Sequence, residues 1–250
     1  MDFVKMEGLG NDFVVVDGPL RPSAADIEAW CDRRRGIGAD GVLAVTSLES
    51  GVRMDYWNAD GSPAEMCGNG LRCVARYARD RGLVDTDAFT VQSATGPRQV
   101  ELLADGRVRA HLATVADDAP EPFEMAGYRL ESVSVGNPHA IAFVDDTYSV
   151  PVSTVGPIVE GDPHFPDRTN VEFATVVDRS RIDLRVWERG SGETLACGTG
   201  AAATAALAHR KGLTDGRVTV MLPGGPLDVE IVGDEVWIEG PARTVFSGTL

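Results

Sequence analysis

Two cysteines stand in the same short motif, Cys-Gly-x-Gly, which begins at Cys67 and again at Cys197. Each motif precedes a run of small and apolar residues that is typical of a helix. A cysteine at the start of a helix lies at the positive end of the helix dipole, which favours the thiolate and lowers the pKa of the thiol. The neighbouring glycines let a ligand approach backbone N–H groups that bind a carboxylate. The motifs therefore predict two reactive thiols, each beside an anion site.

A thiolate and a thiol acting together suit one reaction in particular. Inverting the α-carbon of an amino acid requires a base on one face of the carbon and an acid on the other. A thiolate–thiol pair supplies both roles and exchanges them when the reaction runs backwards. The N–H dipoles at two helix ends would stabilise negative charge that develops on the α-carboxylate. We therefore hypothesise that Cys67 and Cys197 form an acid–base pair for an amino-acid substrate.

Other interpretations of these cysteines remain open. Either one could be a small buried core residue, which is the common role of a cysteine that is not in a disulfide. A redox disulfide between them is less favoured, because the chain has no Cys-x-x-Cys motif. Cys31 and Cys73 are most simply structural. No histidine cluster accompanies the four cysteines, so the sequence predicts no bound metal.

An internal repeat supports pairing the two motifs. When the sequence is aligned with itself at a shift of 130 residues, the separation of the two cysteines, Trp57 falls on Trp187 and Gly82 on Gly212. Upstream, at a slightly smaller shift, Gly10-Asn11 falls on Gly136-Asn137. Self-similarity over so long a period indicates two copies of one structural unit. We predict domains at residues 1–116 and 117–242, with the break in the Pro- and acid-rich stretch 117–122.

Each copy has the same predicted order of elements. Strand-like segments come first, at 13–16, 42–45 and 52–57 in copy one and at 141–144, 171–177 and 182–187 in copy two. A helix follows each cysteine motif. In the first, Leu71, Val74, Ala75 and Ala78 form an apolar stripe, and Gly82 suits the position just past the helix end. The second, Ala201–Ala208, is apolar nearly all round, so it should be buried. A further strand-like segment follows at 217–222. The predicted fold class is α+β. It consists of two pseudo-symmetric domains, each a curled mixed or antiparallel sheet around a central helix, with the active site in the cleft between them.

Composition excludes several classes of protein. The 250 residues are 43% hydrophobic and 24% charged, which provides a substantial core and argues against disordered or fibrous proteins. A formal net charge of −15 argues against binding to nucleic acid. The start of the chain has no secretory-signal pattern, and its longest uncharged stretch, Thr194–Ala208, is too short to span a bilayer. We therefore expect a cytoplasmic protein with no nucleic-acid or membrane partner.

One glycine-rich segment could be mistaken for a cofactor motif. Residues Gly36–Gly41 fit G-x-G-x-x-G, but a dinucleotide site needs a strand before the motif and a helix after it. Here a charged segment precedes the motif and a strand-like segment follows it. The only lysines, Lys5 and Lys211, lie in no motif that suggests a Schiff base. The sequence therefore predicts an enzyme without a cofactor.

A series of short motifs along the whole chain resembles the cofactor-independent diaminopimelate epimerases. They occur in the family's order at Gly8–Phe13, Gly36–Gly41, Asn58–Ser62, Met66–Gly70, Gly136–His139, Thr169–Phe173, Glu188–Gly190 and Ala196–Gly200. The resemblance implies an isomerase that interconverts LL- and meso-diaminopimelate in lysine and peptidoglycan-precursor biosynthesis. It also implies that Cys67 and Cys197 are the acid–base pair, with no cofactor.

The resemblance also implies roles for other residues. His139 and Glu188 would help to deprotonate the two thiols. The α-carboxylate and α-amino group would bind at Gly68, Asn69, Gly198 and Thr199. The distal end of the substrate would be held by Asn11, Asn58, Asn137, Asn170, Glu188 and Arg189, because arginine can grip a carboxylate while Glu188 and the asparagines take the ammonium.

The chain departs from the family at two positions. Some members carry Gln where this chain has Gly41, and some carry Tyr where it has Phe246. The latter position lies at a surface that contributes to a homodimer in relatives, so a homodimer is expected. The C-terminal residues 243–250 are expected to return to the first domain as a strand.

Related proteins supply the competing hypotheses. Proline racemases normally have His after Cys-Gly, where this chain has Asn69, and phenazine-pathway isomerases lack the cysteine pair. A racemase of another amino acid, such as histidine, and a relative that binds an amino acid without turnover remain alternatives. Solvent exchange at the α-carbon would separate an enzyme from a binding protein.

Overall fold

The computed structural model describes residues 1–64, 66–115 and 121–249. The chain forms two compact units: unit 1 comprises Met1–Ala110 and Glu239–Leu250, and unit 2 comprises His111–Ile238. The chain enters unit 2 within β7 (Val108–Thr114) and leaves it within β16 (Glu235–Gly240). The predicted break at 117–122 falls largely on residues 116–120, which lie outside the described residues.

The two units use the same order of strand pairings. The other elements of unit 1 are β1 (Asp2–Gly8), β2 (Asn11–Asp17), α1 (Ala24–Cys31), β3 (Gly41–Ser47), β4 (Val52–Asn58), α2 (Gly68–Asp80), β5 (Ala88–Ser93), β6 (Gly96–Leu102) and β17 (Arg243–Thr249). Those of unit 2 are β8 (Phe123–Met125), β9 (Tyr128–Ser134), β10 (Pro138–Phe143), η1 (Thr147–Ser149), α3 (Val152–Glu160), β11 (Asn170–Asp178), β12 (Arg181–Glu188), β13 (Gly192–Thr194), α4 (Gly198–Arg210), β14 (Arg217–Leu222) and β15 (Gly225–Val232).

From β1 to β6 the pairings alternate: antiparallel, parallel, antiparallel, parallel, antiparallel. The series β9, β10, β11, β12, β14 and β15 repeats this alternation. Such agreement confirms that the sequence repeat encodes two copies of one mixed-sheet unit. The α+β prediction is therefore confirmed.

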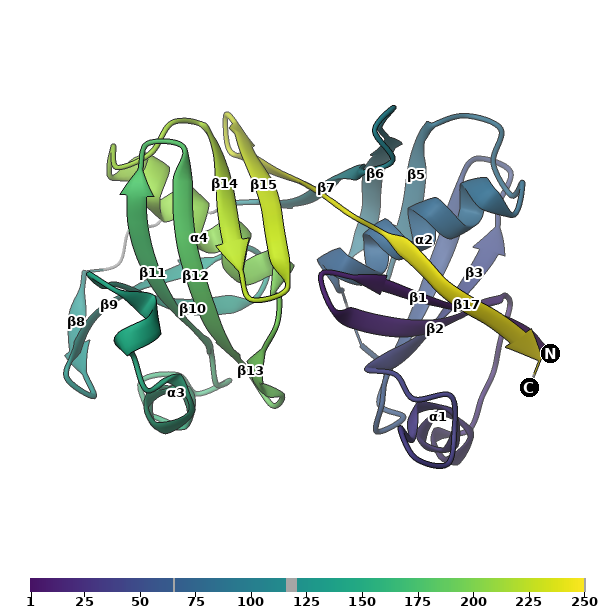
Figure 1. Cartoon of the computed structure of the whole chain (residues 1–250), viewed down its shortest axis with the longest axis horizontal. Helices are drawn as coiled ribbons and strands as arrows, with labels where there is room; N and C mark the ends of the chain where they lie inside the picture. The colour runs from purple at the N-terminus through teal and green to yellow at the C-terminus, as the bar shows by residue number, and fades with distance from the viewer. Residues whose placement is uncertain (65, 116–120, 250) are drawn as a thin grey trace. The chain divides into compact units, whose positions relative to one another are not determined.

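Each unit encloses one helix within its strands. Helix α2 packs against β1 to β6, and α4 packs against β9 to β12, β14 and β15, as Figure 1 shows for each unit. All residues from Ala201 to Ala208 are buried, which confirms the prediction from their apolar composition. In α2 the predicted stripe of Leu71, Val74, Ala75 and Ala78 is also fully buried. A buried Leu or Val side chain stabilises the fold by about 1.5–3 kcal/mol, so these stripes anchor the helices. None of the helices in the described residues is long and apolar enough to cross a membrane.

Both central helices end in the same way. Gly82 and Gly212 follow α2 and α4 and have φ of 68° and 70°, a left-handed conformation that favours glycine. Their N–H groups donate to Arg79 O and His209 O, and the next residues, Leu83 and Leu213, donate back to Ala78 O and Ala208 O, each at 2.9 Å. This geometry satisfies carbonyls that a helix end leaves without partners. The glycines therefore fix where each chain segment leaves its helix.

We predict that Gly212→Ala lowers the free energy of unfolding by about 1 kcal/mol. The cause would be the left-handed backbone alone, because a Cβ at this position would meet no atom within 4 Å. Urea unfolding followed by circular dichroism measures the change. Gly212→Asn serves as the control and should lose less, since asparagine tolerates this conformation. Equal losses in the two variants would contradict this explanation.

Candidate active site

Both motif cysteines cap a central helix. Cys67 precedes α2 and Cys197 precedes α4, each with an extended backbone, and their sulfurs accept hydrogen bonds from Gly70 N and Gly200 N, both at 3.4 Å. The first-turn N–H groups of a helix have no partner within the helix, so a capping group or a ligand must satisfy them. All four cysteines of the chain are present as thiols. The predicted placement of two thiols at helix N-termini is therefore found in both units.

Two asparagines of unit 1 gather around Cys67. Asn11, at the start of β2, accepts from Cys67 Sγ at 3.4 Å and from Asn69 Nδ2 at 3.2 Å through the same Oδ1 atom. Its Nδ2 donates to Asp40 Oδ2 at 2.7 Å. An amide whose nitrogen faces a carboxylate must turn its oxygen the other way, here toward the sulfur. Asp40 therefore fixes the side of Asn11 that faces Cys67.

A charged cluster supports Asn11 from behind. Asp12, which follows it, is paired with Lys5 at 2.8 Å and with Arg33 at 2.7 Å, and Arg33 also contacts Asp40 at 2.6 Å. Desolvation would raise the pKa of Asp12, but hydrogen bonds from Arg33 and Lys5 outweigh it and lower the pKa to about 2. The Lys5 ammonium also donates to Gly38 O. The Gly36–Gly41 segment thus anchors the Asn11 turn, and β3 begins at its last residue, in agreement with the predicted strand.

Arg72 is a buried cation that sequence reasoning missed. Its side chain is fully buried one turn into α2 and donates to Asn69 Oδ1 at 2.9 Å, Gly68 O at 3.3 Å and Pro241 O at 3.2 Å. Burial lowers the pKa of Arg72, because desolvation penalises its charge. Gly8 makes room for it, since a Cβ there would lie 3.2 Å from Arg72 Nη2. Arg72 is one of three arginines in α2, so the sequence alone did not set it apart.

Asn58 lies at the end of β4 in a tight turn. Its Nδ2 donates to Ser62 Oγ at 3.1 Å, its N–H donates to Ser62 O at 2.9 Å, and its carbonyl accepts from Gly61 N. These contacts shape the turn that leads toward Met66 and Cys67.

Cys197 lies deeper than Cys67 and has acidic neighbours. Its side chain is 4% exposed, whereas that of Cys67 is half-buried. Burial raises the pKa of Cys197 well above its ordinary value, and the negative charges of Glu188 and Glu172 raise it further. Hydrogen bonds from Thr199 and Gly200 oppose this shift. The expectation that the helix end would lower the pKa is therefore wrong for Cys197, because desolvation outweighs the dipole.

Glu188 lies beside the Cys197 thiol. Its carboxyl group accepts hydrogen bonds from Cys197 and from Thr194 Oγ1. Burial raises the pKa of Glu188, which makes its carboxylate a stronger base than an exposed one. The role of Glu188 in assisting a thiol stays a prediction.

His139 is fully buried between two polar partners. Its Nδ1 lies 2.7 Å from Glu172 Oε1, and its Nε2 lies 3.0 Å from Asn137 Oδ1. Asn137 in turn donates to Thr199 Oγ1 at 3.5 Å, and Thr199 Oγ1 lies 3.4 Å from Cys197 Sγ. His139 therefore reaches Cys197 through two other predicted site residues. Glu172 was not among the predicted residues, although an acid within an apolar strand was a signal.

A buried carboxylate holds the segment that carries Glu188 and Arg189. Glu160, at the end of α3, accepts from Trp187 Nε1 and Gly190 N, both at 2.7 Å, and pairs with Arg168 at 2.8 Å. Asn170 accepts from Arg189 N and donates to Pro138 O, both at 3.0 Å. The Arg189 side chain donates to Asp167 O at 3.0 Å. Asn170 and Glu160 thus fix the backbone on both sides of Glu188 and Arg189.

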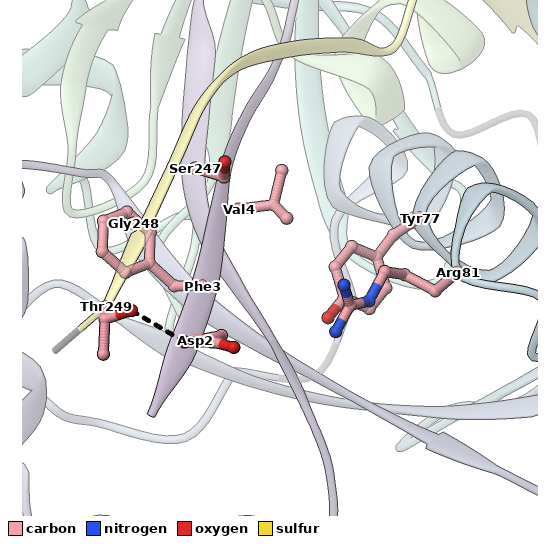
Figure 2. Close-up of a pocket in the computed structure, with 8 residues that line it drawn as sticks. All are labelled: Asp2, Phe3, Val4, Tyr77, Arg81, Ser247, Gly248 and Thr249. Atoms are coloured by element: carbon pink, nitrogen blue, oxygen red, sulfur yellow. Dashed lines mark hydrogen bonds between the residues drawn. The ribbon is translucent and has the colours of Figure 1, made fainter.

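A pocket in unit 1 has a different lining. Its volume is about 270 Å³, and residues 2–4, 247–249, Tyr77 and Arg81 line it, as Figure 2 shows for these side chains. Thr249 donates to Asp2 at 2.8 Å. The pocket contains none of the predicted site residues. In the part of the chain that the structure describes, no three His, Cys, Asp or Glu side chains gather to hold a metal ion.

Sequence comparison identifies the family. The sequence model of diaminopimelate epimerase matches residues 3–116 and 131–245, which include all the predicted site residues. The chain belongs to the diaminopimelate epimerase family. The recognition made from the short motifs is confirmed.

Relatives in the family match over nearly their whole length. The diaminopimelate epimerase of Pelotomaculum thermopropionicum is 44% identical over 274 residues, covering 99% of this chain and 98% of that protein. The diaminopimelate epimerase of Alkalilimnicola ehrlichii is 44% identical over 272 residues, with the same coverage. Diaminopimelate epimerase 1 of a Nostoc species is 40% identical and covers 100% and 99% of the two chains.

Solved structures of lower sequence identity share the family's fold. A phenazine biosynthesis protein of the PhzF family from Bacillus anthracis has a TM-score of 0.78 at 15% identity, covering 100% of this chain and 98% of that one. A probable proline racemase from Agrobacterium radiobacter has a TM-score of 0.76 at 14% identity, with coverage of 100% and 92%. Both similarities support the duplicated fold of the diaminopimelate epimerase family.

We predict that Asp12→Asn destabilises the protein by about 2 kcal/mol at pH 7, because the folded-state pKa of Asp12 is about two units below its unfolded value. A carboxylate with a lowered pKa contributes stability above the unfolded pKa, and this is lost as pH falls from about 4 toward 2. The cost of the substitution should therefore shrink at pH 3. Urea unfolding at both pH values measures it, and Asp85→Asn, at an exposed position, should change little. A cost that is the same at both pH values would refute the linkage.

Proposed function

We propose that this protein interconverts LL- and meso-diaminopimelate by two-base proton transfer between Cys67, Cys197 and the substrate α-carbon. The observation that carries the proposal is the matched pair of cysteine-capped helices in a chain of the diaminopimelate epimerase family. The relatives named above carry that activity in their names. The mechanism requires both sulfurs to act on opposite faces of one carbon.

In the proposed reaction one thiolate removes the α-proton and becomes a thiol. The electron pair left on the α-carbon delocalises into the α-carboxylate, where first-turn N–H groups of α2 and α4 would stabilise it. The opposite thiol then donates its proton to the other face and becomes a thiolate. The product has the inverted centre, and the enzyme has exchanged the protonation states of its two cysteines.

Glu188 supports the direction in which Cys197 is the base. The thiol of Cys197 first gives its proton to the Glu188 carboxylate, which already accepts a hydrogen bond from it. The resulting thiolate then accepts from Thr199 Oγ1 and from Gly200 N, each of which lies 3.4 Å from the sulfur. Glu188 and His139 are thus proposed to assist from unit 2.

The remaining proposed contacts divide by the two ends of the substrate. Gly68, Asn69, Gly198 and Thr199 would bind the reacting amino-acid end, and Asn11, Asn58, Asn137, Asn170, Glu188 and Arg189 the distal end. Arg189 is exposed and its backbone is held by Asn170, so its guanidinium can turn to a carboxylate without unfolding the segment. The activity would belong to lysine and peptidoglycan-precursor biosynthesis in the cytoplasm.

We predict that Cys67→Ala and Cys197→Ala each lower the rate of epimerisation by at least about 10³-fold, as expected for loss of an essential acid or base. Chromatographic separation of LL- and meso-diaminopimelate measures the rate, and circular dichroism checks folding. Cys31→Ala, a buried cysteine outside the site, should retain activity. Parental rates in either of the first two variants would disprove the two-base mechanism.

The same assay in D2O separates the alternatives. The proposed enzyme incorporates solvent deuterium at the α-carbon of diaminopimelate, whereas a protein that only binds the substrate does not. A panel of L-amino acids, including histidine, tests the alternative racemase. Incorporation of deuterium into histidine but not into diaminopimelate would show that the two-base mechanism acts on histidine instead.

A homodimer is proposed through strand β17. This strand pairs with β1, and its Val245 and Phe246 are 56% and 46% exposed. Phe246 contacts the Phe3 ring edge-to-face at 6.0 Å, so only part of its apolar surface is covered within the chain. Apolar side chains on an edge strand favour association with a second copy.

We predict that Phe246→Asp converts the dimer to a monomer, because a carboxylate placed in an apolar interface loses its hydration. Sedimentation equilibrium measures the mass against the 26.6 kDa of one chain. Val177→Asp changes a comparably exposed apolar residue of unit 2 and serves as the control. A wild-type protein that sediments as a monomer would refute the proposed assembly.

A further inference from the structure

A row of hydrogen bonds connects Glu172 to Cys197 within unit 2. Glu172 Oε1 lies 2.7 Å from His139 Nδ1, and His139 Nε2 lies 3.0 Å from Asn137 Oδ1. Asn137 Nδ2 lies 3.5 Å from Thr199 Oγ1, which lies 3.4 Å from Cys197 Sγ. Every member of the row except Glu172 is already proposed to belong to the site. Glu172 therefore needs an explanation of its own.

The Asn137 amide determines which group donates and which accepts in each hydrogen bond of the row. An amide oxygen only accepts, so His139 Nε2 must carry a proton and donate to Asn137 Oδ1. The Nδ1 atom of His139 then shares a second proton with Glu172 Oε1, either as a carboxylic acid donating to a neutral ring or as an imidazolium donating to a carboxylate. In both cases His139 Nε2 donates to Asn137 Oδ1, so the donors and acceptors between Asn137 and Cys197 are the same.

The same reasoning assigns the donors and acceptors between Asn137 and the Cys197 sulfur. Asn137 Nδ2 only donates, so Thr199 Oγ1 accepts from it and is left with its own proton for Cys197 Sγ. The sulfur then accepts from Thr199 and from Gly200 N, while its thiol proton is given to Glu188. The titratable groups that face Cys197 are Glu188 on β12 and Glu172 on β11, with His139 on β10 behind them.

The position of Glu172 is costly for a group without a function. The side chain is fully buried, and its Oε2 atom has no hydrogen-bond partner among the described residues. It also packs closely under the first turn of α4, since a Cβ on Gly200 would lie 2.7 Å from Glu172 Oε1. An apolar residue would avoid the free-energy cost of burying this carboxyl group. Burial raises the pKa of Glu172, which keeps a proton available to the pair.

We propose that Glu172 is a positioning residue for Cys197: it fixes the tautomer of His139, and thereby makes the Thr199 hydroxyl donate to the Cys197 sulfur. The inference deepens the proposed function and rests on it for its catalytic meaning. Without a donor at position 172, a neutral His139 can carry its proton on Nδ1. Asn137 is then free to turn over and give its oxygen to Thr199, which removes the donor from the sulfur.

Two substitutions at Glu172 separate this role from simple packing. Glu172→Gln supplies an N–H that can donate to His139 Nδ1, so it should preserve the row. Glu172→Met has a similar volume and supplies no donor. The readout is the rate of Cys197 alkylation by iodoacetamide as a function of pH, obtained from peptide mass spectrometry. Cys67 in the same sample is the internal reference, because its own partners lie in unit 1.

Both variants remove the Glu172 charge, which raises the pKa of Cys197, so the comparison between them isolates the hydrogen-bond donor. We expect the pH of half-maximal Cys197 alkylation to be about one to two units higher in Glu172→Met than in Glu172→Gln, the effect of losing one hydrogen bond to a charged group. The pH dependence of Cys67 should remain unchanged in both variants. A Cys197 profile in folded Glu172→Met that coincides with that of Glu172→Gln, or lies below it, would overturn the proposal.

A second pair of variants covers the case in which Glu172→Met does not fold. Thr199→Ser keeps the hydroxyl donor and should retain the parental Cys197 profile, whereas Thr199→Val removes it and should shift the profile as Glu172→Met would. Combining Glu172→Gln with Thr199→Val should add nothing beyond Thr199→Val. An additional shift to higher pH in that double variant would contradict a role exerted through Thr199. Alkylation needs no substrate, so these results stand apart from the assay of epimerase activity.

Discussion

Each unit depends on one constraint, the hydrogen bond from a backbone N–H to a cysteine sulfur at the N-terminus of its central helix. Ser, Thr, Asp and Asn are the usual residues at this position, because oxygen is the better acceptor. The chain instead has Cys67 and Cys197, whose sulfurs accept at 3.4 Å. A glycine follows each cysteine and leaves the first turn open to a ligand. The surrounding strands bury the rest of each helix and so hold its start in place.

The duplicated backbone does not give two equivalent thiols. Around Cys67 the partners are amides, with the buried guanidinium of Arg72 behind Asn69. Around Cys197 they are a carboxyl group, a hydroxyl group and a histidine–glutamate pair. The groups at the ends of these networks also differ: Asp40 and Arg72 contact the amides of one unit, and the His139–Glu172 pair contacts Asn137 in the other. The same fold therefore provides two different electrostatic environments for one kind of side chain.

The sequence predicted what depends on local pattern and repetition. The stripe at Leu71, Val74, Ala75 and Ala78, the capping glycines and the order of strands all follow from periodicity and from turn chemistry. The predicted strand 217–222 coincides with β14, whereas 141–144 misses the first residues of β10, because Pro138 and His139 do not look like strand residues.

What could not be predicted depends on neighbours distant in sequence. The sequence does not decide whether Arg72 and Glu172 are buried, and only the packed strands reveal that both are buried and hydrogen-bonded. The state of the Cys197 thiol was missed for the same reason, since the helix dipole can be inferred from sequence while desolvation cannot. The roles of Asn58 and Arg189 stay predictions from family resemblance.

The last residues of the chain complete unit 1. Strand β17 pairs with β1 along Asp2 to Glu7, and Pro241 O accepts the hydrogen bond of Arg72 Nε. During synthesis on the ribosome, unit 1 therefore lacks strand β17 and the Pro241 acceptor of its buried guanidinium until residues 239–250 have been made. Unit 2 is complete in sequence earlier, although it begins later. The half that is translated first must consequently wait for synthesis of the second half before it can finish folding.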